Sequence, residues 1–173
     1  PQLKEFEGSV PVLVPVGIDQ DPHLRLARDI SKRIKELKFI QLSSTYNLFL
    51  PGLGGGKMSA SDANSFISLV DSPKEVERKI KKYAFSGGRK TLDEHRKKGG
   101  NPDVDVSFQY LRFLFEEDDA KLKEIEKKYR SGEMLTSELK QITINKINAF
   151  LKVHQEKRKK AKSKIKDFVY NSK

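Results

Sequence analysis

Hydrophobic and polar positions divide the chain into a short mixed segment and a longer helical one. Val10–Val16 is an apolar run rich in β-branched residues, which is typical of a buried strand in a parallel sheet, although its two prolines weaken a central position. A turn at 17–22 then leads into a helix to about Leu37, with Asp21 as N-cap and Pro22 at the first helical position. The apolar positions at helical spacing are Leu26, Ile30, Ile34 and Leu37. Strand, loop and helix make half a βαβ unit, and residues 39–50 are expected to be extended and semi-buried.

The C-terminal part has the pattern of an all-helical bundle. Ser72–Glu75 and Thr91–Glu94 read as capping boxes, so one helix starts at Pro73 and a shorter one ends at Gly99–Gly100. Further helices are predicted at about 103–116 and 118–130, and a long one from about Thr136 to Val169. The inward positions are Val76, Ile80, Tyr83 and Ala84, then Val106, Tyr110, Phe113 and Leu114, then Leu122, Ile125 and Tyr129, and finally Leu139, Ile142, Ile147, Phe150 and Leu151.

Charge changes along the chain with the hydrophobic pattern. Residues 1–73 contain 8 Lys and Arg against 8 Asp and Glu, whereas residues 74–173 contain 27 against 16. The net charge of +11 therefore belongs to the second part, which suggests a polyanionic partner or, equally, a solvated lysine-rich surface. We place a domain boundary near residue 72, so that residues 1–72 form one part and 73–173 the other.

Composition excludes several classes of site. The chain has no cysteine, so disulfides and thiolate metal sites are excluded, and its three scattered histidines predict no metal site. No apolar run approaches the roughly 20 residues that cross a bilayer, and no signal segment opens the sequence. We therefore expect a soluble cytoplasmic protein with no membrane partner. Because the first residue is proline, we also expect the chain to be trimmed from a longer one.

The glycine-rich stretch Pro51–Gly56 is expected to form a mobile loop. A Walker A loop needs G-x-x-x-x-G-K followed by serine or threonine, but position 51 is proline and Met58 replaces the hydroxyl residue. The pattern therefore does not predict a P-loop nucleotidase.

The residues after this loop, Lys57, Met58, Ser59, Ala60 and Ser61, resemble the K-M-S-K-S signature of class I aminoacyl-tRNA synthetases. A lysine ammonium on a mobile loop can close over phosphate oxygens as charge builds on them, and serine hydroxyls can complete the cradle. The resemblance implies that Lys57, Met58 and Ser59 bind ATP and that Lys57, Ser59 and Ser61 serve in catalysis. Alanine at the fourth position removes one lysine of the signature. The alternative is an ordinary surface turn.

A second resemblance lies a few dozen residues upstream. Gly17, Ile18, Asp19 and Gln20 resemble the G-x-D-Q turn of the tyrosyl and tryptophanyl subclass, at the carboxyl end of a strand, where ligands bind in open α/β sheets. It implies that Gly17 and Asp19 hold the ATP ribose and that Gln20 contacts the tryptophan headgroup. The alternative is a turn whose aspartate caps the next helix.

Residues 84–108 resemble the tryptophanyl-tRNA synthetases of eukaryotes and archaea. The matching stretches are Ala84–Arg89, Glu94–Arg96, Gly99–Asn101 and Asp103–Phe108. By this resemblance Arg89 and Lys140 lie near the tRNA anticodon, while Lys90 stands where eukaryotic members often have an acidic residue. His95 is expected to cap or pack, and Asp103 and Asp105 to organise a turn and cap the following helix.

Together the resemblances imply an α/β plus all-α protein: the rear part of a Rossmann-like catalytic domain, then a helical anticodon-binding domain. They imply ATP- and Mg²⁺-dependent formation of tryptophanyl-adenylate, transfer to tRNA(Trp), and a homodimer. The family's H-I-G-H motif and its indole-recognising residues are expected before Pro1, so this segment alone is expected to be inactive. The alternatives are a non-enzymatic fragment that binds RNA or protein, and a tyrosyl-type enzyme.

Overall fold

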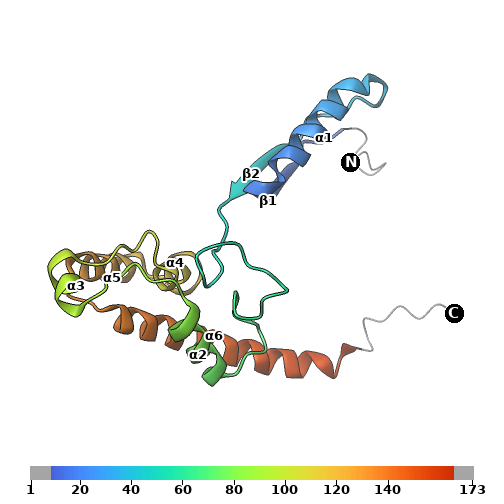
Figure 1. Ribbon diagram of the computed structural model, residues 1–173. Coiled ribbons are helices and arrows are strands. Elements are labelled where there is room, and N and C mark those ends of the chain that lie inside the picture. Colours follow the sequence, from blue (N-terminus) through green and yellow to red (C-terminus); the bar gives the residue numbers. More distant parts are fainter. Residues whose placement is uncertain (1–8, 166–173) are drawn as a thin grey trace. The chain divides into compact units, whose positions relative to one another are not determined.

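The computed structural model describes residues 9–165 of the 173-residue chain. It separates into two compact units, and the boundary along the chain lies between Phe49 and Leu50 (Figure 1). The composition change near residue 72, on which the predicted boundary rests, therefore lies inside the second unit. Residues 50–72 fold with the helices because Leu53 and the residues that follow it pack into the helical core.

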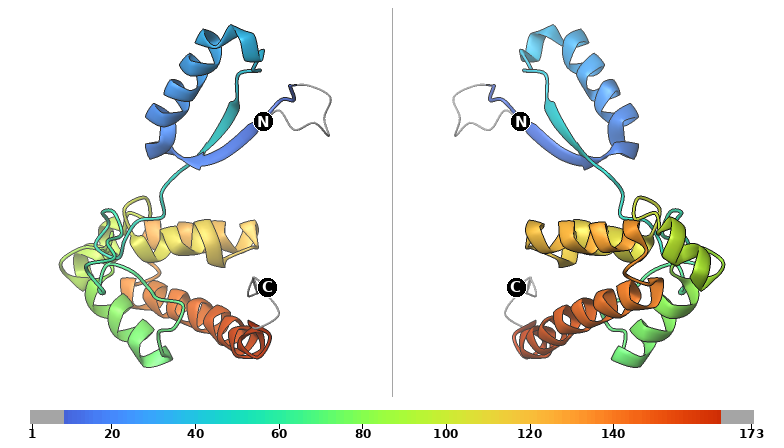
Figure 2. Two further views of the ribbon diagram at one scale, coloured as in Figure 1. Left: turned by 90° about the vertical axis from the view of Figure 1, so that its right-hand side faces the viewer. Right: turned by 90° about the vertical axis from the view of Figure 1, so that its left-hand side faces the viewer.

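The first unit is a β-α-β unit. Strand β1 (Leu13–Gly17) pairs in parallel with β2 (Ser43–Asn47), so that Leu13 lies opposite Ser43 and Gly17 opposite Asn47. Between them come a 3-10 turn η2 (Ile18–Gln20), helix α1 (Asp21–Arg33) and a second 3-10 turn η3 (Lys35–Leu37) (Figure 2). The parallel sheet that the first strand indicated is present, and β2 lies within the segment expected to be extended.

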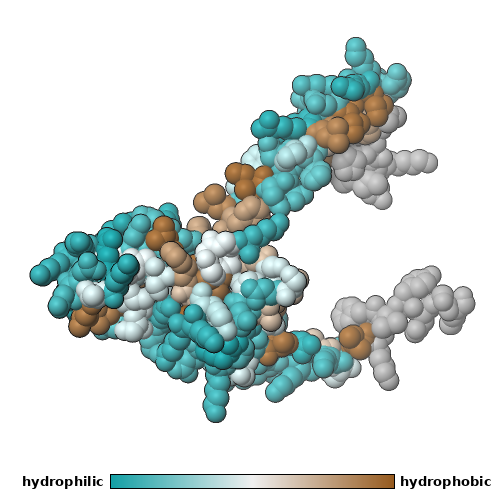
Figure 3. All heavy atoms as spheres, in the orientation of Figure 1, coloured by the Kyte–Doolittle hydropathy of each residue, from teal (hydrophilic) through white to brown (hydrophobic). Residues whose placement is uncertain are grey.

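Three details of the first unit differ from the prediction. The strand starts at Leu13 and is not buried, since Leu13 is 63% exposed and a two-stranded sheet leaves much of α1 uncovered, Leu26 included. The N-cap of α1 is Gln20 rather than Asp21, whose carboxylate instead accepts a hydrogen bond from the Tyr46 hydroxyl at 2.5 Å. The helix ends at Arg33 because the next residue leaves the helical region (φ −90°, ψ 75°). Hydrophobic side chains accordingly show on the surface of this unit (Figure 3).

The second unit is helical. Its elements are α2 (Pro73–Tyr83), α3 (Leu92–Lys98), α4 (Val106–Tyr110), a π-helical turn η4 (Leu111–Phe115), α5 (Asp119–Ser131) and α6 (Thr136–Lys162). Helix α6 contacts α2, α4 and α5 (Figure 2). One core cluster includes Leu53, Val76, Ile80, Val106, Ile147 and Leu151, and the other includes Phe108, Leu111, Ile125, Tyr129 and Leu139.

Helix starts in this unit follow the sequence closely. The hydroxyls of Ser72 and Thr91 each accept the backbone N–H three residues on, which is the N-cap half of the predicted capping boxes. Within the described residues, the return bonds from the N-cap N–H groups to the Glu75 and Glu94 carboxylates are not formed. The helix predicted at 103–116 begins later, at Val106, because Asp105 is its N-cap, and it passes into the π-helical turn. Phe113 and Leu114, predicted to face inward, are 42% and 58% exposed there. The last helix runs unbroken to Lys162, and positions 166–169 of its predicted span lie outside the described residues.

Candidate functional site

The glycine loop is fastened at its base. Leu53 is fully buried, its N–H donates to the Ser65 carbonyl at 2.8 Å, and its carbonyl accepts from the Phe85 N–H at 2.7 Å. Gly52 N–H donates to the Gly56 carbonyl at 2.6 Å, which closes a tight turn. Residues 54–57 are exposed beyond this base. The predicted loop is confirmed, and its attachment points are the core on one side and Ser65 on the other.

The K-M-S-A-S residues lie between these attachment points. Met58 packs against the hydrophobic core of the second unit, whereas Lys57 and Ser59 on either side of it are exposed. The hydroxyls of Ser59 and Ser61 are 2.8 Å apart, and the Ser65 hydroxyl accepts the Ser59 N–H at 3.0 Å. Lys57 has no ion pair within residues 9–165. Its ammonium is therefore available to an anionic ligand, with hydroxyl groups two and four residues further on.

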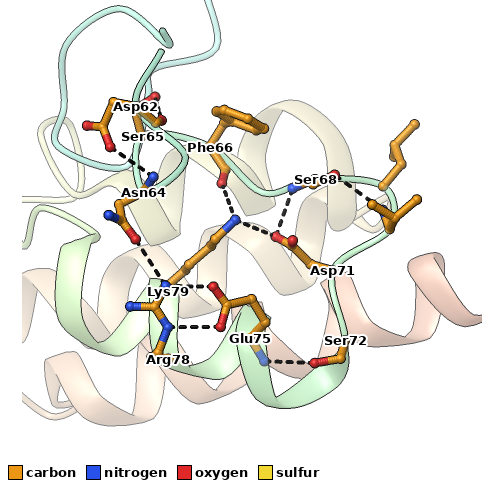
Figure 4. Close-up of polar contacts among 12 residues, drawn as sticks. Asp62, Asn64, Ser65, Phe66, Ser68, Asp71, Ser72, Glu75, Arg78 and Lys79 are labelled. Carbon is orange, nitrogen blue, oxygen red and sulfur yellow. Dashed lines mark hydrogen bonds and ion pairs between the residues drawn. The ribbon is translucent and has the colours of Figure 1, made fainter. Parts of the chain in front are cut away.

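A buried ion pair, which sequence reasoning missed, fixes the segment after the loop. Lys79 on α2 is 4% exposed, and its ammonium lies 2.7 Å from the Asp71 carboxylate and 3.2 Å from the Phe66 carbonyl (Figure 4). The same carboxylate oxygen accepts the Ser68 N–H at 2.9 Å. The sequence does hold a signal for this ion pair. Lys79 follows Val76 by three residues and so lies on the apolar face of α2, and a lysine buried there needs an acidic partner.

Arg78, the neighbour of Lys79, reaches the other end of this segment. Its guanidinium donates to the Asn64 side-chain oxygen at 3.0 Å and to both carboxylate oxygens of Glu75, at 2.9 and 2.6 Å (Figure 4). Asn64 in turn belongs to the turn that follows Ser61, where its N–H donates to Asp62 at 2.9 Å. Consecutive residues of α2 thus hold Asn64 and Phe66.

The structure places the G-x-D-Q residues together in the first unit, at the carboxyl end of β1. Gly17 is the last residue of the strand, and Asp19 and Gln20 lie exposed in the 3-10 turn that follows. The Asp19 carboxylate folds back so closely that a Cβ on Gly17 would lie 2.9 Å from its Oδ1 atom. The predicted ribose residues are therefore in contact with each other, while Lys57, Ser59 and Ser61 belong to the second unit.

The two anticodon candidates lie close to the first turns of α6. Arg89 is exposed and donates through Nε to the Gly99 carbonyl at 3.0 Å. A Cβ on the preceding Gly88 would lie 2.3 Å from Oγ1 of Thr136, so this segment packs against the first residue of α6. Lys140 follows one turn later. The structure therefore brings the Arg89 segment and Lys140 to the same end of α6.

Lys140 makes contacts that sequence reasoning did not foresee. Its ammonium donates to the carbonyls of Ala84 and Lys81, at 2.9 and 3.2 Å, and so binds the C-terminal end of α2. Burial lowers the pKa of this ammonium, and the negative charge of Asp105 opposes that shift. Any contact with a base has to compete with these two hydrogen bonds.

Asp105 organises the segment that carries Arg89. Its carboxylate is fully buried and accepts four hydrogen bonds: from Gly87 N–H and the Tyr129 hydroxyl at 2.8 and 2.7 Å, and from Ser107 and Phe108 N–H at 3.0 and 3.3 Å. The predicted helix cap is thus confirmed, but the bonds to Gly87 and Tyr129 were not foreseen. Burial, followed by the charge of Asp105, raises the pKa of the Tyr129 hydroxyl, which remains a donor at physiological pH.

His95 packs, as predicted. It is 4% exposed, its Nε2 lies 2.9 Å from the Met134 carbonyl, and its ring lies against Tyr129. Within residues 9–165, no group of three His, Cys, Asp or Glu side chains could hold a metal ion, and no helix is long and apolar enough to cross a membrane.

Comparison with known proteins shows to which family the chain belongs. Residues 5–152 match the family described as tRNA synthetases class I (W and Y). The chain belongs to this family. The predicted membership of the class I synthetase family is thereby confirmed, and the roles of the lysine loop and of the G-x-D-Q turn stay predictions.

Individual relatives narrow the likeness to the tryptophanyl branch. Tryptophan–tRNA ligase of Saccharolobus solfataricus is 55% identical over 163 residues, which are 93% of this chain and 42% of that protein. Cytoplasmic tryptophan–tRNA ligase of Homo sapiens is 48% identical over 172 residues, 98% of this chain and 36% of that protein. The crystal structure of tryptophanyl-tRNA synthetase from Aeropyrum pernix K1 superposes with a TM-score of 0.89 at 39% identity, covering 99% of this chain and 47% of that one. The chain spans less than half the length of these relatives.

Proposed function

We propose that these residues are part of a tryptophanyl-tRNA synthetase, which activates tryptophan with ATP and transfers it to tRNA(Trp). The observation that carries the proposal is the 55% identity to an archaeal tryptophan–tRNA ligase along 93% of the chain. Lys57 is exposed on an anchored glycine loop and has no ion pair among residues 9–165, which supports the proposal because a phosphate-binding lysine needs this arrangement. A fragment that only binds RNA or protein would not require it.

In this proposal each site residue has a limited task. The Lys57 ammonium neutralises charge that develops on the ATP phosphates, with Ser59 and Ser61 as hydrogen-bond donors and Met58 as the apolar anchor between them. Gly17 and Asp19 hold the ribose, and Gln20 contacts the tryptophan headgroup. Adenylation then depends on positioning and charge stabilisation rather than on a protein nucleophile.

Magnesium fits the proposal as a companion of ATP. The described residues offer no set of three acidic or histidine ligands, so they do not fit a resident metal site. Mg²⁺ is commonly held through substrate phosphates together with water and few protein ligands. We therefore assign it no protein ligand here.

The proposed layout follows the family resemblance and the charge distribution. Residues 1–72 supply the rear part of a Rossmann-like catalytic domain, and residues 73–173, which carry the whole positive excess, supply the helical anticodon-binding domain. The lysine loop belongs to the catalytic part by role, although it packs with the helices. We further propose a homodimer and, from the relatives named cytoplasmic, a cytoplasmic enzyme.

The direct test is amino-acid-dependent ATP–pyrophosphate exchange by the full-length protein that contains these residues. Exchange that depends on tryptophan supports the proposal, and exchange that depends on tyrosine instead would establish the tyrosyl alternative. A full-length protein that exchanges with neither amino acid, yet binds RNA, would overturn the enzymatic reading. Charging of tRNA(Trp) completes the test.

We predict that Arg89→Ala lowers charging of tRNA(Trp) while tryptophan activation stays near normal. An arginine can offer two hydrogen bonds to a base edge, worth about 1–3 kcal/mol of discrimination, and anticodon bases are splayed out and accessible. The structure leaves Arg89 exposed, with Nε bound to Gly99. The measurement is kcat/KM for charging of tRNA(Trp) and of an anticodon-mutant tRNA.

Lys159→Ala is the matched control, because Lys159 is an exposed cation near the far end of α6. It should weaken all tRNAs alike or change nothing. If Arg89→Ala leaves the preference for the tryptophan anticodon intact, Arg89 is not a base-reading residue, and the unusual Lys90 beside it becomes the first position to examine.

A further inference from the structure

Two consecutive residues of α2 hold the segment that returns from the lysine loop, together with Gln155 of α6, which donates to the Leu69 and Asp71 carbonyls at 3.1 and 3.0 Å. Arg78 bonds Asn64, and its neighbour Lys79 bonds Phe66 and Asp71, so these two residues hold the chain at three points (Figure 4). The Lys79 contacts are buried and secure the segment to the core. The Arg78 contact is the one nearer to Lys57 along the chain, and it lies at the surface.

Hydrogen bonds connect Asn64 to the lysine loop step by step. Asn64 N–H donates to the Asp62 carboxylate at 2.9 Å, and Asp62 N–H donates to the Ser59 carbonyl at 3.1 Å. The Ser65 hydroxyl accepts from Ser59 N–H and also lies 2.7 Å from the Asp62 carbonyl. The turn that ends the K-M-S-A-S sequence is therefore built on Asn64 and Ser65, and Arg78, which lies outside this turn, bonds the Asn64 side chain.

Two contacts besides the one to Asn64 orient the Arg78 side chain. Glu75, one turn earlier on α2, accepts from Nε and Nη2, so the two side chains form a fork-to-fork pair. On the other side, Nη1 donates to the Tyr83 hydroxyl at 3.3 Å, and the guanidinium lies 5.3 Å from the centre of that ring. A planar group held on two sides can present the second Nη2 hydrogen to Asn64 in one direction.

We propose that Arg78 is a positioning residue for Lys57: its guanidinium, oriented by Glu75, fixes Asn64 and thereby the turn that closes the lysine loop. The proposal rests on the function proposed above, because it assigns Arg78 to the adenylation step. An exposed ion pair between residues three apart is by itself worth little for stability. The Arg78–Glu75 ion pair affects the loop because Arg78 also bonds Asn64.

The test uses the full-length synthetase and tryptophan-dependent pyrophosphate exchange. Arg78→Ala should lower kcat about tenfold and leave KM for tryptophan within about twofold, since small misplacements of a transition-state group are costly. Arg78→Lys should lose nearly as much, because an ammonium keeps the charge but cannot bond Glu75 and Asn64 as a fork. Full activity of Arg78→Lys together with a defect in Arg78→Ala would mean that only the charge matters, which contradicts the proposal.

Two double variants show whether Arg78 acts through the turn and through Lys57. Arg78→Ala combined with Asn64→Ala should lose about tenfold, the same as either alone, and a loss near a hundredfold would show that the two residues act independently. Adding Arg78→Ala to Lys57→Ala should lower kcat no further. A further tenfold fall in that background would overturn the proposal, because the residue to be positioned is already gone.

Lys81→Ala is the matched control on the same helix, since Lys81 forms an i,i+4 ion pair with Glu77 at 2.5 Å and its side chain makes no described contact with the loop. Its kcat should be unchanged. Lys57→Ala separates the proposed function of the loop from the proposed role of Arg78. If this variant leaves pyrophosphate exchange intact, the proposed function of the loop fails. If Lys57→Ala is inactive while Arg78→Ala and Asn64→Ala are both normal, only the role of Arg78 fails.

Discussion

Replacing Lys57 by alanine in the full-length synthetase is expected to lower kcat for tryptophan activation by about 10²–10³-fold, equivalent to roughly 2.7–4 kcal/mol. KM for tryptophan should change little. Lys57 is exposed and without an ion pair in the described chain, on a loop whose base is fastened to the core, so its ammonium is free to meet phosphates when the loop closes. A contact formed mainly in the transition state affects kcat rather than ground-state binding.

The measurement is steady-state pyrophosphate exchange with ATP and tryptophan varied in turn. Lys57→Arg, which keeps the charge on a longer and planar group, should recover part of the rate. Lys159→Ala, which removes an exposed lysine from α6, should leave the rate unchanged. A rise in KM for ATP at constant kcat would instead identify Lys57 as a ground-state ligand, and the transition-state role would be wrong.

The sequence predicts this loop well because its signals are local. Glycines predict a turn, and the residues after them match a short signature, so no long-range contact is needed to find Lys57. What fastens the loop is not local. Leu53 pairs with Ser65 and Phe85, and Asp71 with Lys79, over separations that no periodicity encodes.

Burial is the property that the pattern predicts least well. Val10–Val16 and the stripe of α1 have the hydrophobicity of a buried strand and helix, yet Leu13 and Leu26 are exposed in a unit with two strands. Periodicity shows which face of a helix or strand is apolar, but whether that face is buried depends on which other elements pack against it. The lysine-rich helices show the opposite error. A count of charges predicts that lysines face the solvent, yet Lys79 and Lys140 make specific contacts within the protein.

The hydrogen bonds of Asp105, near the anticodon candidates, also show that the sequence predicts local contacts but not long-range ones. A helix cap is readable from sequence, since aspartate precedes Val106 and Ser107, and the structure confirms it. That the same carboxylate also binds Gly87, 18 residues earlier, and Tyr129, 24 residues later, depends on tertiary packing. These bonds connect the Arg89 segment to α4 and α5, so Asp105 holds three parts of the chain together in addition to capping α4.

We therefore predict that Asp105→Ala lowers the free energy of unfolding by about 2–4 kcal/mol. Loss of a helix N-cap costs about 1 kcal/mol, and leaving the buried Gly87 N–H unsatisfied costs roughly another 1–3 kcal/mol. Urea unfolding of the full-length protein measures the change as a lower midpoint at constant m-value. Asp103→Ala is the matched control: Asp103 is an exposed aspartate two residues away that pairs with Arg130 at 2.9 Å, so its loss should cost about 0–1 kcal/mol.

Asp105→Asn separates the cap from the connection to Arg89. An amide oxygen can still accept from Ser107 and Phe108, but its NH₂ group faces the Gly87 N–H, and two donors cannot bond each other. This variant should keep most of the helix cap, release the Gly87–Arg89 segment, and lower tRNA charging while pyrophosphate exchange stays near normal. Equal losses in both reactions would show that Asp105 supports the fold in general and has no particular effect on Arg89.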